Sequence, residues 1–159
     1  MAEPGKQRPL GLKEGFEVPQ SVLEKLAYIE AFDLEADPEY ASILKRLTHG
    51  GATREFKRFL ALPLLYPGDP AFSFVPSLPL DSLWHAFILN TPRYRGFCDH
   101  VYGSYLDHVP ARSRHQTEQR VFAGPMQFTV EKVNGAFDSV NRRFWRKLAF
   151  CGPCLLRKG

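Results

Sequence analysis

The chain of 159 residues contains only three cysteines and no apolar run close to the ~20 residues that cross a bilayer. Its first 15 residues are polar and rich in proline and glycine, unlike an apolar secretion signal. In a chain without such a signal, an odd number of cysteines favours reduced thiols over a disulfide framework. We therefore expect a cytoplasmic protein.

Several catalytic motifs are missing as well. The sequence has no glycine-rich loop that cradles phosphates, no G-x-S-x-G elbow and no pair of carboxylates at a recognisable spacing. These absences disfavour nucleotide-dependent, serine-hydrolase and glycosidase chemistry. The residues present are 44% hydrophobic and 24% charged, a composition typical of globular proteins, and a chain of this length most naturally forms one domain.

Apolar residues recur at helical intervals along most of the chain. The pattern predicts an all-α fold, a compact bundle of about six to seven helices with a flexible N-terminal arm. Asp37-Pro38 gives a clear helix start, with Asp as the N-cap and Pro in the first helical position. We expect the arm to span residues 1–17, a single helical domain residues 18–150, and a C-terminal tail residues 151–159.

Residues 126–140 allow two interpretations. Alternating residues from Gln127 to Val133, followed by Asn134-Gly135, are typical of a β-hairpin. Apolar residues from Val130 to Leu148 instead recur every three or four positions, and this longer pattern favours a helix. We predict the helix, preceded by another helix that ends at Gly124-Pro125.

The stretch from Pro76 to Pro110 contains the candidate site residues His85, Cys98 and His108. His85 and Cys98 lie on two predicted helices joined by a tight connection, so the helices are expected to be antiparallel neighbours. His108 follows just after the second helix. Imidazole and thiolate are the ligands of zinc and of other transition metals. They are also the pair required for a cysteine nucleophile activated by histidine.

Three explanations of these residues stay open. A buried cysteine often acts as a small hydrophobic residue, and a histidine often only hydrogen-bonds the backbone. Our leading hypothesis is a non-enzymatic binding or scaffold domain in which His85, Cys98 and His108 form a structural cluster or bind a transition metal such as zinc. The alternative is an enzyme in which the cluster holds a catalytic metal or a Cys–His pair, assisted by Tyr94 or Asp81.

Residues 53–110 carry a series of motifs in a specific order. The motifs are Phe59-Leu60-Ala61-Leu62, Asp81-x-x-Trp84-His85, Tyr94-x-x-Phe97-Cys98 and His108-x-Pro110. This order resembles the glycine-rich domain-containing protein family, in particular its small bacterial members. The resemblance implies a helical domain in which His85, Cys98 and His108 act together, and it implies no particular activity. Ile88 and Asp107 stand where many members of that family have further histidines, and the glycine-rich tail is missing.

The C-terminal segment is basic. Residues 111–159 contain ten Lys/Arg and three Asp/Glu, whereas the first 110 residues have a net charge of −3. Cations alternate with aromatic residues here, as in proteins that bind single-stranded nucleic acid. A segment of this kind can contact nucleic acid, an anionic membrane surface or an acidic protein, or it can simply be a solvated helix face. The candidate contact residues are Arg142, Arg143, Trp145, Arg146 and Lys147.

Cys151-Gly-Pro-Cys154 has the spelling of the thioredoxin dithiol. In thioredoxin the motif follows a strand and opens a helix, whose dipole lowers the pKa of the first thiol. Here the motif follows a basic segment near the end of the sequence, without a βαβ pattern around it. We therefore favour a chance pair or half of a metal clip over redox catalysis.

Overall fold

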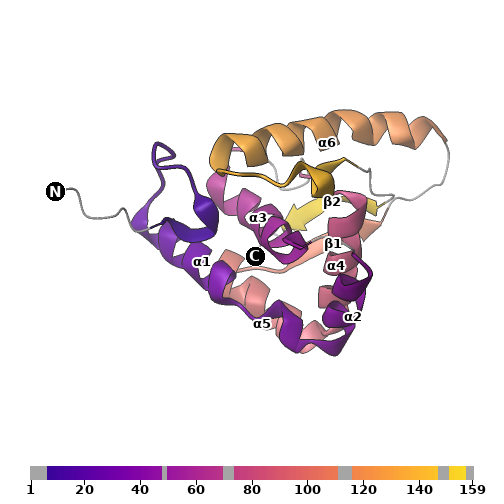
Figure 1. The fold of residues 1–159 in the computed structure, drawn as a ribbon, viewed down its shortest axis with the longest axis horizontal. Coiled ribbons are helices and arrows are strands. Elements are labelled where there is room, and N and C mark those ends of the chain that lie inside the picture. Colours follow the sequence, from indigo (N-terminus) through magenta and orange to yellow (C-terminus); the bar gives the residue numbers. More distant parts are fainter. Residues whose placement is uncertain (1–6, 48–49, 70–73, 111–115, 147–150, 157–159) are drawn as a thin grey trace.

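The computed structural model describes residues 7–47, 50–69, 74–110, 116–146 and 151–156 (Figure 1). The fold is all-α, as predicted, with six α-helices and one short pair of strands in these ranges. The helices are α1 (Gln20–Ala31), α2 (Pro38–Arg46), α3 (Ala52–Leu65), α4 (Leu78–Leu89), α5 (Thr91–Tyr102) and α6 (Gln116–Ala136). The strands are β1 (Leu106–Pro110) and β2 (Cys151–Leu156). None of the helices in the described ranges is long and apolar enough to span a membrane.

Helix α3 runs through the middle of the molecule and packs against α1, α4 and α6 (Figure 1). Most of its residues are buried, and they include Phe56 and Phe59. Proline removes one helical hydrogen bond and usually ends or kinks a helix. Helix α3 nevertheless continues past Pro63 to Leu65, since the residues on both sides of the proline pack into the core.

The start of α2 follows the sequence pattern. Oδ1 of Asp37 accepts hydrogen bonds from the backbone N–H groups of Glu39 at 2.9 Å and Tyr40 at 3.3 Å. The side chain therefore caps two of the amide groups that have no partner within the helix. Its second oxygen accepts a hydrogen bond from Asn90 at 2.7 Å, which ties α2 to the connection between α4 and α5.

Helix α6 decides between the two interpretations of residues 126–140. The segment is helical up to Ala136, so the helix prediction is confirmed there and the hairpin alternative is wrong. The predicted break at Gly124-Pro125 is also wrong, since α6 is continuous through it. Burial of Met126, Val133 and Ala136 in the core offsets the local cost of the proline. After Ala136 the chain leaves the helix and forms a 3-10 turn at Arg142–Trp145.

Residues 7–17 are part of the folded domain, contrary to the predicted N-terminal arm. Leu10 and Leu12 are almost fully buried. The backbone N–H of Leu10 donates to Oε1 of Glu30 at 2.9 Å, and its carbonyl accepts from Nε of Arg58 at 2.9 Å. These hydrogen bonds explain why a segment rich in proline and glycine packs in one place. The rest of the predicted arm, residues 1–6, lies outside the described residues.

The two strands pair antiparallel and extend the folded domain into the predicted C-terminal tail. Leu106 pairs with Leu156, Asp107 with Leu155 and His108 with Cys154. The register then shifts by one residue, so that Pro110 pairs with Cys151. The backbone of residues 151–156 is therefore fixed against β1, and only residues 157–159 of the predicted tail lie outside the described residues.

Candidate metal centre

Two side chains of the candidate centre lie on one face of α4. Asp81 is in the first turn of the helix, and His85 follows four residues later, which places it one turn further along the same face. The helix begins after Ser77 and has Pro79 in its first turn. Proline is tolerated there because the N–H groups of the first turn have no hydrogen-bond partner within the helix. The partial positive charge at a helix N-terminus favours a carboxylate such as that of Asp81.

The third side chain, His108, comes from β1. Leu106 and His108 are two residues apart in the strand and therefore share one of its faces. Leu106 is buried, and the side chain of His108 is only 5% exposed, so this face lies against the helices. The imidazole of His108 packs on the indole of Trp84, with 4.2 Å between the ring centroids.

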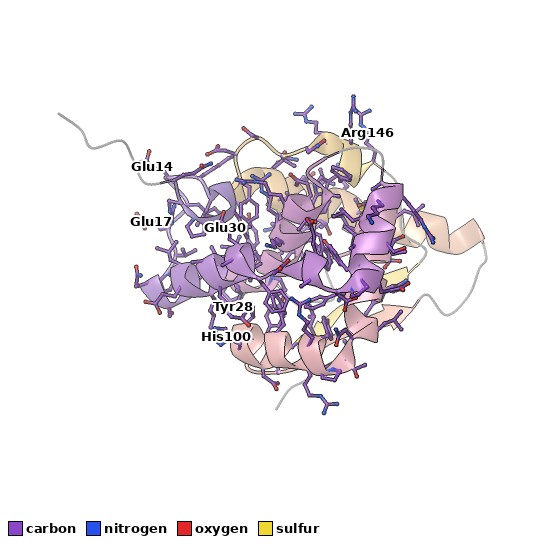
Figure 2. The ribbon with its side chains drawn as sticks, turned by 60° about the horizontal axis from the view of Figure 1, so that its bottom comes forward. Glu14, Glu17, Tyr28, Glu30, His100 and Arg146 are labelled. Atoms are coloured by element: carbon purple, nitrogen blue, oxygen red, sulfur yellow. The ribbon has the colours of Figure 1, made fainter. Side chains whose placement is uncertain are left out.

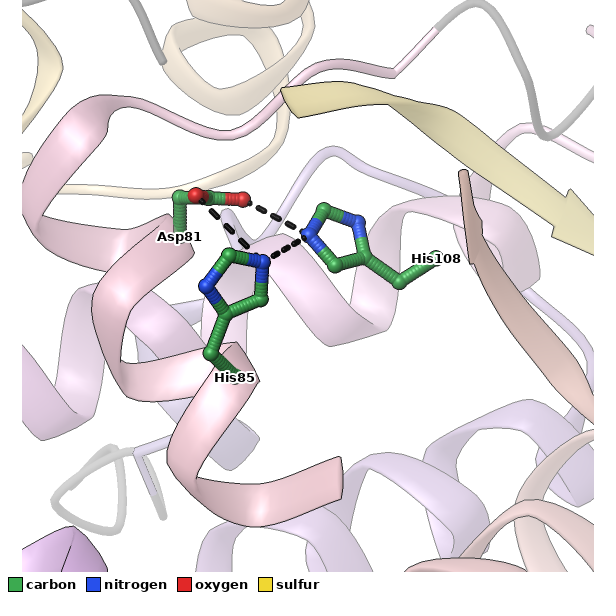
Figure 3. A group of neighbouring side chains, drawn as sticks. All are labelled: Asp81, His85 and His108. Atoms are coloured by element: carbon green, nitrogen blue, oxygen red, sulfur yellow. Dashed lines mark hydrogen bonds and ion pairs between the residues drawn. The ribbon is translucent and has the colours of Figure 1, made fainter. Parts of the chain in front are cut away.

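The reactive atoms of the three side chains converge (Figure 3). Nε2 of His108 lies 2.7 Å from Nε2 of His85 and 2.9 Å from Oδ1 of Asp81. Nε2 of His85 lies 3.7 Å from Oδ2 of Asp81. Figure 3 shows both imidazoles directing the same ring nitrogen toward the carboxylate. All three ligand atoms thus surround one point in space.

The centre is buried on one side and open on the other. The side chains of Asp81 and His108 are 6% and 5% exposed, whereas that of His85 is 48% exposed. A carboxylate with so little access to water needs a nearby positive charge or several hydrogen bonds. Oδ1 of Asp81 makes no hydrogen bond within the described residues, although Nε2 of His108 is 2.9 Å away. Nε2 of His108 instead forms a 2.7 Å hydrogen bond with Nε2 of His85, in which the tautomers decide which imidazole donates.

The spacing of the three atoms is close to that of ligands around a metal ion. Zinc forms bonds of about 2.0–2.1 Å to nitrogen and oxygen in a tetrahedral arrangement, which separates neighbouring ligand atoms by about 3.3–3.4 Å. The observed separations of 2.7, 2.9 and 3.7 Å bracket that value. Two imidazoles and one carboxylate form the ligand set of several zinc sites and of non-haem ferrous sites.

The structure brings two of the three predicted residues together and leaves the third apart. His85 and His108 meet, but Asp81 rather than Cys98 completes the described group of ligand atoms that lie within 4.8 Å of one another. The thiol of Cys98 is fully buried and interacts instead with Tyr94 and the backbone of Leu106. Burial raises the pKa of this thiol above its ordinary value, so it is protonated at neutral pH and a poor nucleophile. A signal for Asp81 is present in the sequence, because Asp and His four residues apart in a helix share one face.

The predicted contact surface at the C-terminus is only partly exposed. Trp145 is buried, and its indole N–H donates to Oε2 of Glu55 at 2.9 Å. The expectation that Trp145 is a stacking group on the surface is therefore wrong. The reason is that a buried carboxylate offers its indole an acceptor. Arg142, Arg143 and Arg146 are exposed, and Arg146 lies at the outer edge of the molecule in Figure 2. Lys147 lies outside the described residues.

The fold and the centre together define a small helical domain with a cluster of carboxylate and imidazole groups. The family model described as UCP032817-like matches residues 22–128, about two thirds of the chain, so the chain belongs to this family. No curated protein and no solved structure matches the chain.

This family assignment corrects the resemblance to glycine-rich domain-containing proteins, which is wrong. The resemblance depended on motifs between residues 53 and 110, all within the matched region. Several of the motif residues are buried aromatics of the core, among them Phe59, Trp84 and Tyr94. Packing of helices selects such residues in many proteins, and they are therefore weak markers of one family.

Proposed function

We propose that this protein is a helical domain that binds one divalent transition metal ion, zinc in the first instance, through Asp81, His85 and His108. The observation that carries the proposal is the convergence of one carboxylate oxygen and two imidazole nitrogens within 4.8 Å. A bound cation would compensate the buried carboxylate of Asp81 and would replace the 2.7 Å hydrogen bond between the two ring nitrogens. The proposal keeps the predicted cytoplasmic location, where the three cysteines would stay reduced.

The enzymatic alternative uses the same three ligands. Catalytic zinc sites have three protein ligands and leave one position to water, which the metal makes acidic. The half-exposed side chain of His85 favours this alternative, since it places one edge of the centre at the surface. A Cys–His nucleophile has less support, because the thiol of Cys98 is buried and lies outside the group that contains His85.

The adaptor alternative relies on the three exposed arginines Arg142, Arg143 and Arg146. Nucleic-acid bases cannot stack on Trp145 in this alternative, because its indole is buried. A contact with an acidic protein, nucleic acid or an anionic membrane surface would then be electrostatic, and its affinity would fall steeply with added salt. No geometry in the described residues favours one of these partners, so metal binding remains the leading proposal.

Isothermal titration calorimetry with zinc tests the proposal. The full chain, kept reduced and freed of metal with a chelator, is compared with His108→Gln, which removes the buried imidazole ligand. His100→Gln is the matched control, because His100 is exposed, packs beside Tyr28 with 3.9 Å between the ring centroids (Figure 2), and does not belong to the group of Asp81, His85 and His108. The expected result is one zinc per chain for the wild type and the control, and a loss of at least tenfold in affinity for His108→Gln. Equal affinity of all three proteins would refute the proposal.

A further inference from the structure

Two arginines on one face of α3 approach the same glycine. Arg54 and Arg58 are four residues apart, a spacing that places two side chains on one face of a helix. A Cβ built on Gly11 would lie 2.9 Å from Nη2 of Arg54 and 3.0 Å from Nη2 of Arg58. The two Nη2 atoms are therefore no more than about 6 Å apart, a distance at which two positive charges repel each other. An anion between them would remove this repulsion.

The two arginines differ in how their charge is compensated. Arg58 is buried and forms an ion pair with Glu55 at 2.9 Å. It also donates to the backbone carbonyl groups of Leu10 and Asp138. Arg54 is exposed, and the described part of the chain gives it neither a hydrogen bond nor an ion pair. Burial lowers the pKa of the Arg58 guanidinium, Glu55 raises it in part, and the charge of Arg54 lowers it further. The charge of Arg54 is thus uncompensated beside another cation.

Both guanidinium groups line a cavity of about 600 Å³ between α3, the N-terminal segment and the segment that follows α6. A cavity of this size can hold a small molecule. Arg8 adds a third positive charge to the lining, whereas Glu14 (labelled in Figure 2) and Asp138 add two negative charges. The three arginines therefore outnumber the two carboxylates, and the lining has a net positive charge.

We propose that this cavity binds the phosphate group of a small molecule, with Arg54 and Arg58 as its principal cationic contacts. Guanidinium nitrogens donate charge-assisted hydrogen bonds of about 2.7–2.9 Å to phosphate oxygens. The oxygens of one phosphate group can therefore reach both Nη2 atoms at their present separation. Two guanidinium groups also match the two negative charges of a phosphate better than the single charge of a carboxylate.

Gly11 and the contacts of Arg58 prepare the cavity for such a ligand. The missing side chain of Gly11 leaves open the space in front of both Nη2 atoms, which a Cβ would occupy. The ion pair with Glu55 and the hydrogen bond to the carbonyl of Leu10 hold the guanidinium of Arg58 in place before any ligand binds. A preorganised contact loses less conformational freedom on binding, and this favours affinity.

An NMR titration of the isotope-labelled full chain at pH 8 and constant ionic strength tests the proposal. The probes are inorganic phosphate and glycerol phosphate, and acetate is the anion with a single charge. We expect saturable changes in the backbone amide signals of Gly11 and Ser139 with both phosphates, because both residues line the cavity. Acetate should bind at least about tenfold more weakly. Tighter binding of glycerol phosphate would identify an organic phosphate as the ligand, and equal affinity would identify free phosphate.

Arg54→Gln removes the uncompensated charge, and Arg95→Gln is its matched control. Arg95 is exposed on α5 and does not line the cavity. Each variant loses one positive charge from the exposed face of a helix, so the net charge of the chain changes equally in both. We expect the affinity for phosphate to fall at least about fivefold in Arg54→Gln and to change by less than about twofold in Arg95→Gln.

Several results would overturn the proposal. Signal changes that do not saturate, or an equal loss of affinity in both variants, would mean that phosphate is attracted only by the overall charge. Acetate that binds as tightly as phosphate would also overturn it. Changes at Gly51 and Thr53 or at Asp81, with none at Gly11, would place the anion at the start of α3 or at the metal centre. The inference does not depend on metal binding, so the two proposals can fail separately.

Discussion

The indole N–H of Trp84 donates a hydrogen bond to the hydroxyl oxygen of Tyr94, 3.0 Å away in the core. The Tyr94 hydroxyl in turn donates to the carbonyl oxygen of Leu106 at 2.6 Å. These two bonds connect α4, α5 and β1 in one buried chain, and Leu106 is two residues before His108. Trp84, which immediately precedes His85 in sequence, therefore helps to fix the distance between the two imidazoles.

Substitution of Tyr94 by phenylalanine tests this connection. The variant leaves the indole N–H of Trp84 and the carbonyl of Leu106 without their partner in a buried site. Each unpaired group costs about 1–3 kcal/mol, so we expect the free energy of unfolding to fall by about 2–4 kcal/mol in a urea titration at pH 8. Tyr28→Phe, at a half-buried position, is the control and should stay within about 0.5 kcal/mol of the wild type. A Tyr94→Phe variant as stable as this control would rule out the connection.

The effect of the same substitution should depend on pH. Burial raises the pKa of the Tyr94 hydroxyl above its ordinary value of 10.0. Above pH 10.0 the unfolded state loses this proton while the folded state keeps it, so the contribution of the hydroxyl to stability falls as pH rises. The stability difference between wild type and Tyr94→Phe should shrink by about 1.4 kcal/mol per pH unit above that value. If urea titrations from pH 8 to 11 give a constant stability difference between wild type and Tyr94→Phe, the raised pKa of the Tyr94 hydroxyl is contradicted.

The buried ion pair of Glu55 and Arg58 should be critical for folding. The side chains are 2% and 1% exposed, with 2.9 Å between Oε1 and Nη1. Nη2 of Arg58 donates to the carbonyl of Asp138 at 2.7 Å, which ties the segment after α6 to α3. Glu55→Gln removes the negative charge and leaves the guanidinium buried without compensation, so we expect a loss of about 3–5 kcal/mol in a denaturant titration.

Glu17→Gln is the control for this variant. Glu17 is exposed, and its substitution should change the free energy of unfolding by no more than about 0.5 kcal/mol. A loss below about 1 kcal/mol in Glu55→Gln would contradict the critical role of this buried ion pair.

Two glycines should respond to alanine in opposite directions. Gly11 has a φ of +70°, and a Cβ built on it would lie 2.9 Å from Nη2 of Arg54. Gly11→Ala should therefore destabilise the protein by at least about 1–2 kcal/mol, the cost of a left-handed conformation alone. Gly96 lies in exposed helical backbone of α5, and a Cβ there would meet nothing within 4 Å. Gly96→Ala should raise stability by about 0.5–1 kcal/mol. Thermal unfolding of both variants checks these two predictions. Melting temperatures that shift equally in the two variants would contradict them.

Local patterns in the sequence were sufficient for most of the helices. Asp37-Pro38 predicts the start of α2 because the cap and the fixed φ of proline act within a single turn. The break predicted at Gly124-Pro125 failed because the gain from packing α6 against α3 is decided by distant residues. The sequence predicts a free N-terminal arm for the same reason, since the contacts that hold residues 7–17 come from distant residues. Arg58, which holds Leu10 in place, is 48 residues further along the chain.

The candidate centre was predictable in part. His85 and His108 were identified from sequence, and whether they bind a metal stays a prediction. Cys98 is predicted as a site residue because its helix is the expected neighbour of the helix that carries His85. Side-chain packing instead directs its thiol toward Tyr94 and Leu106. The meeting of His108 with His85 depends on packing between residues that are 23 positions apart in the sequence, which no local pattern contains.

The most direct test is to locate the ion. A crystal of the full chain grown with zinc, with diffraction data measured on both sides of the zinc absorption edge, shows the position of any bound zinc as anomalous difference density. We predict one peak per chain between Oδ1 or Oδ2 of Asp81 and Nε2 of both His85 and His108, within about 2.0–2.2 Å of each ligand atom. Clear electron density for the three side chains with no anomalous peak between them, or with zinc bound elsewhere, would contradict the account.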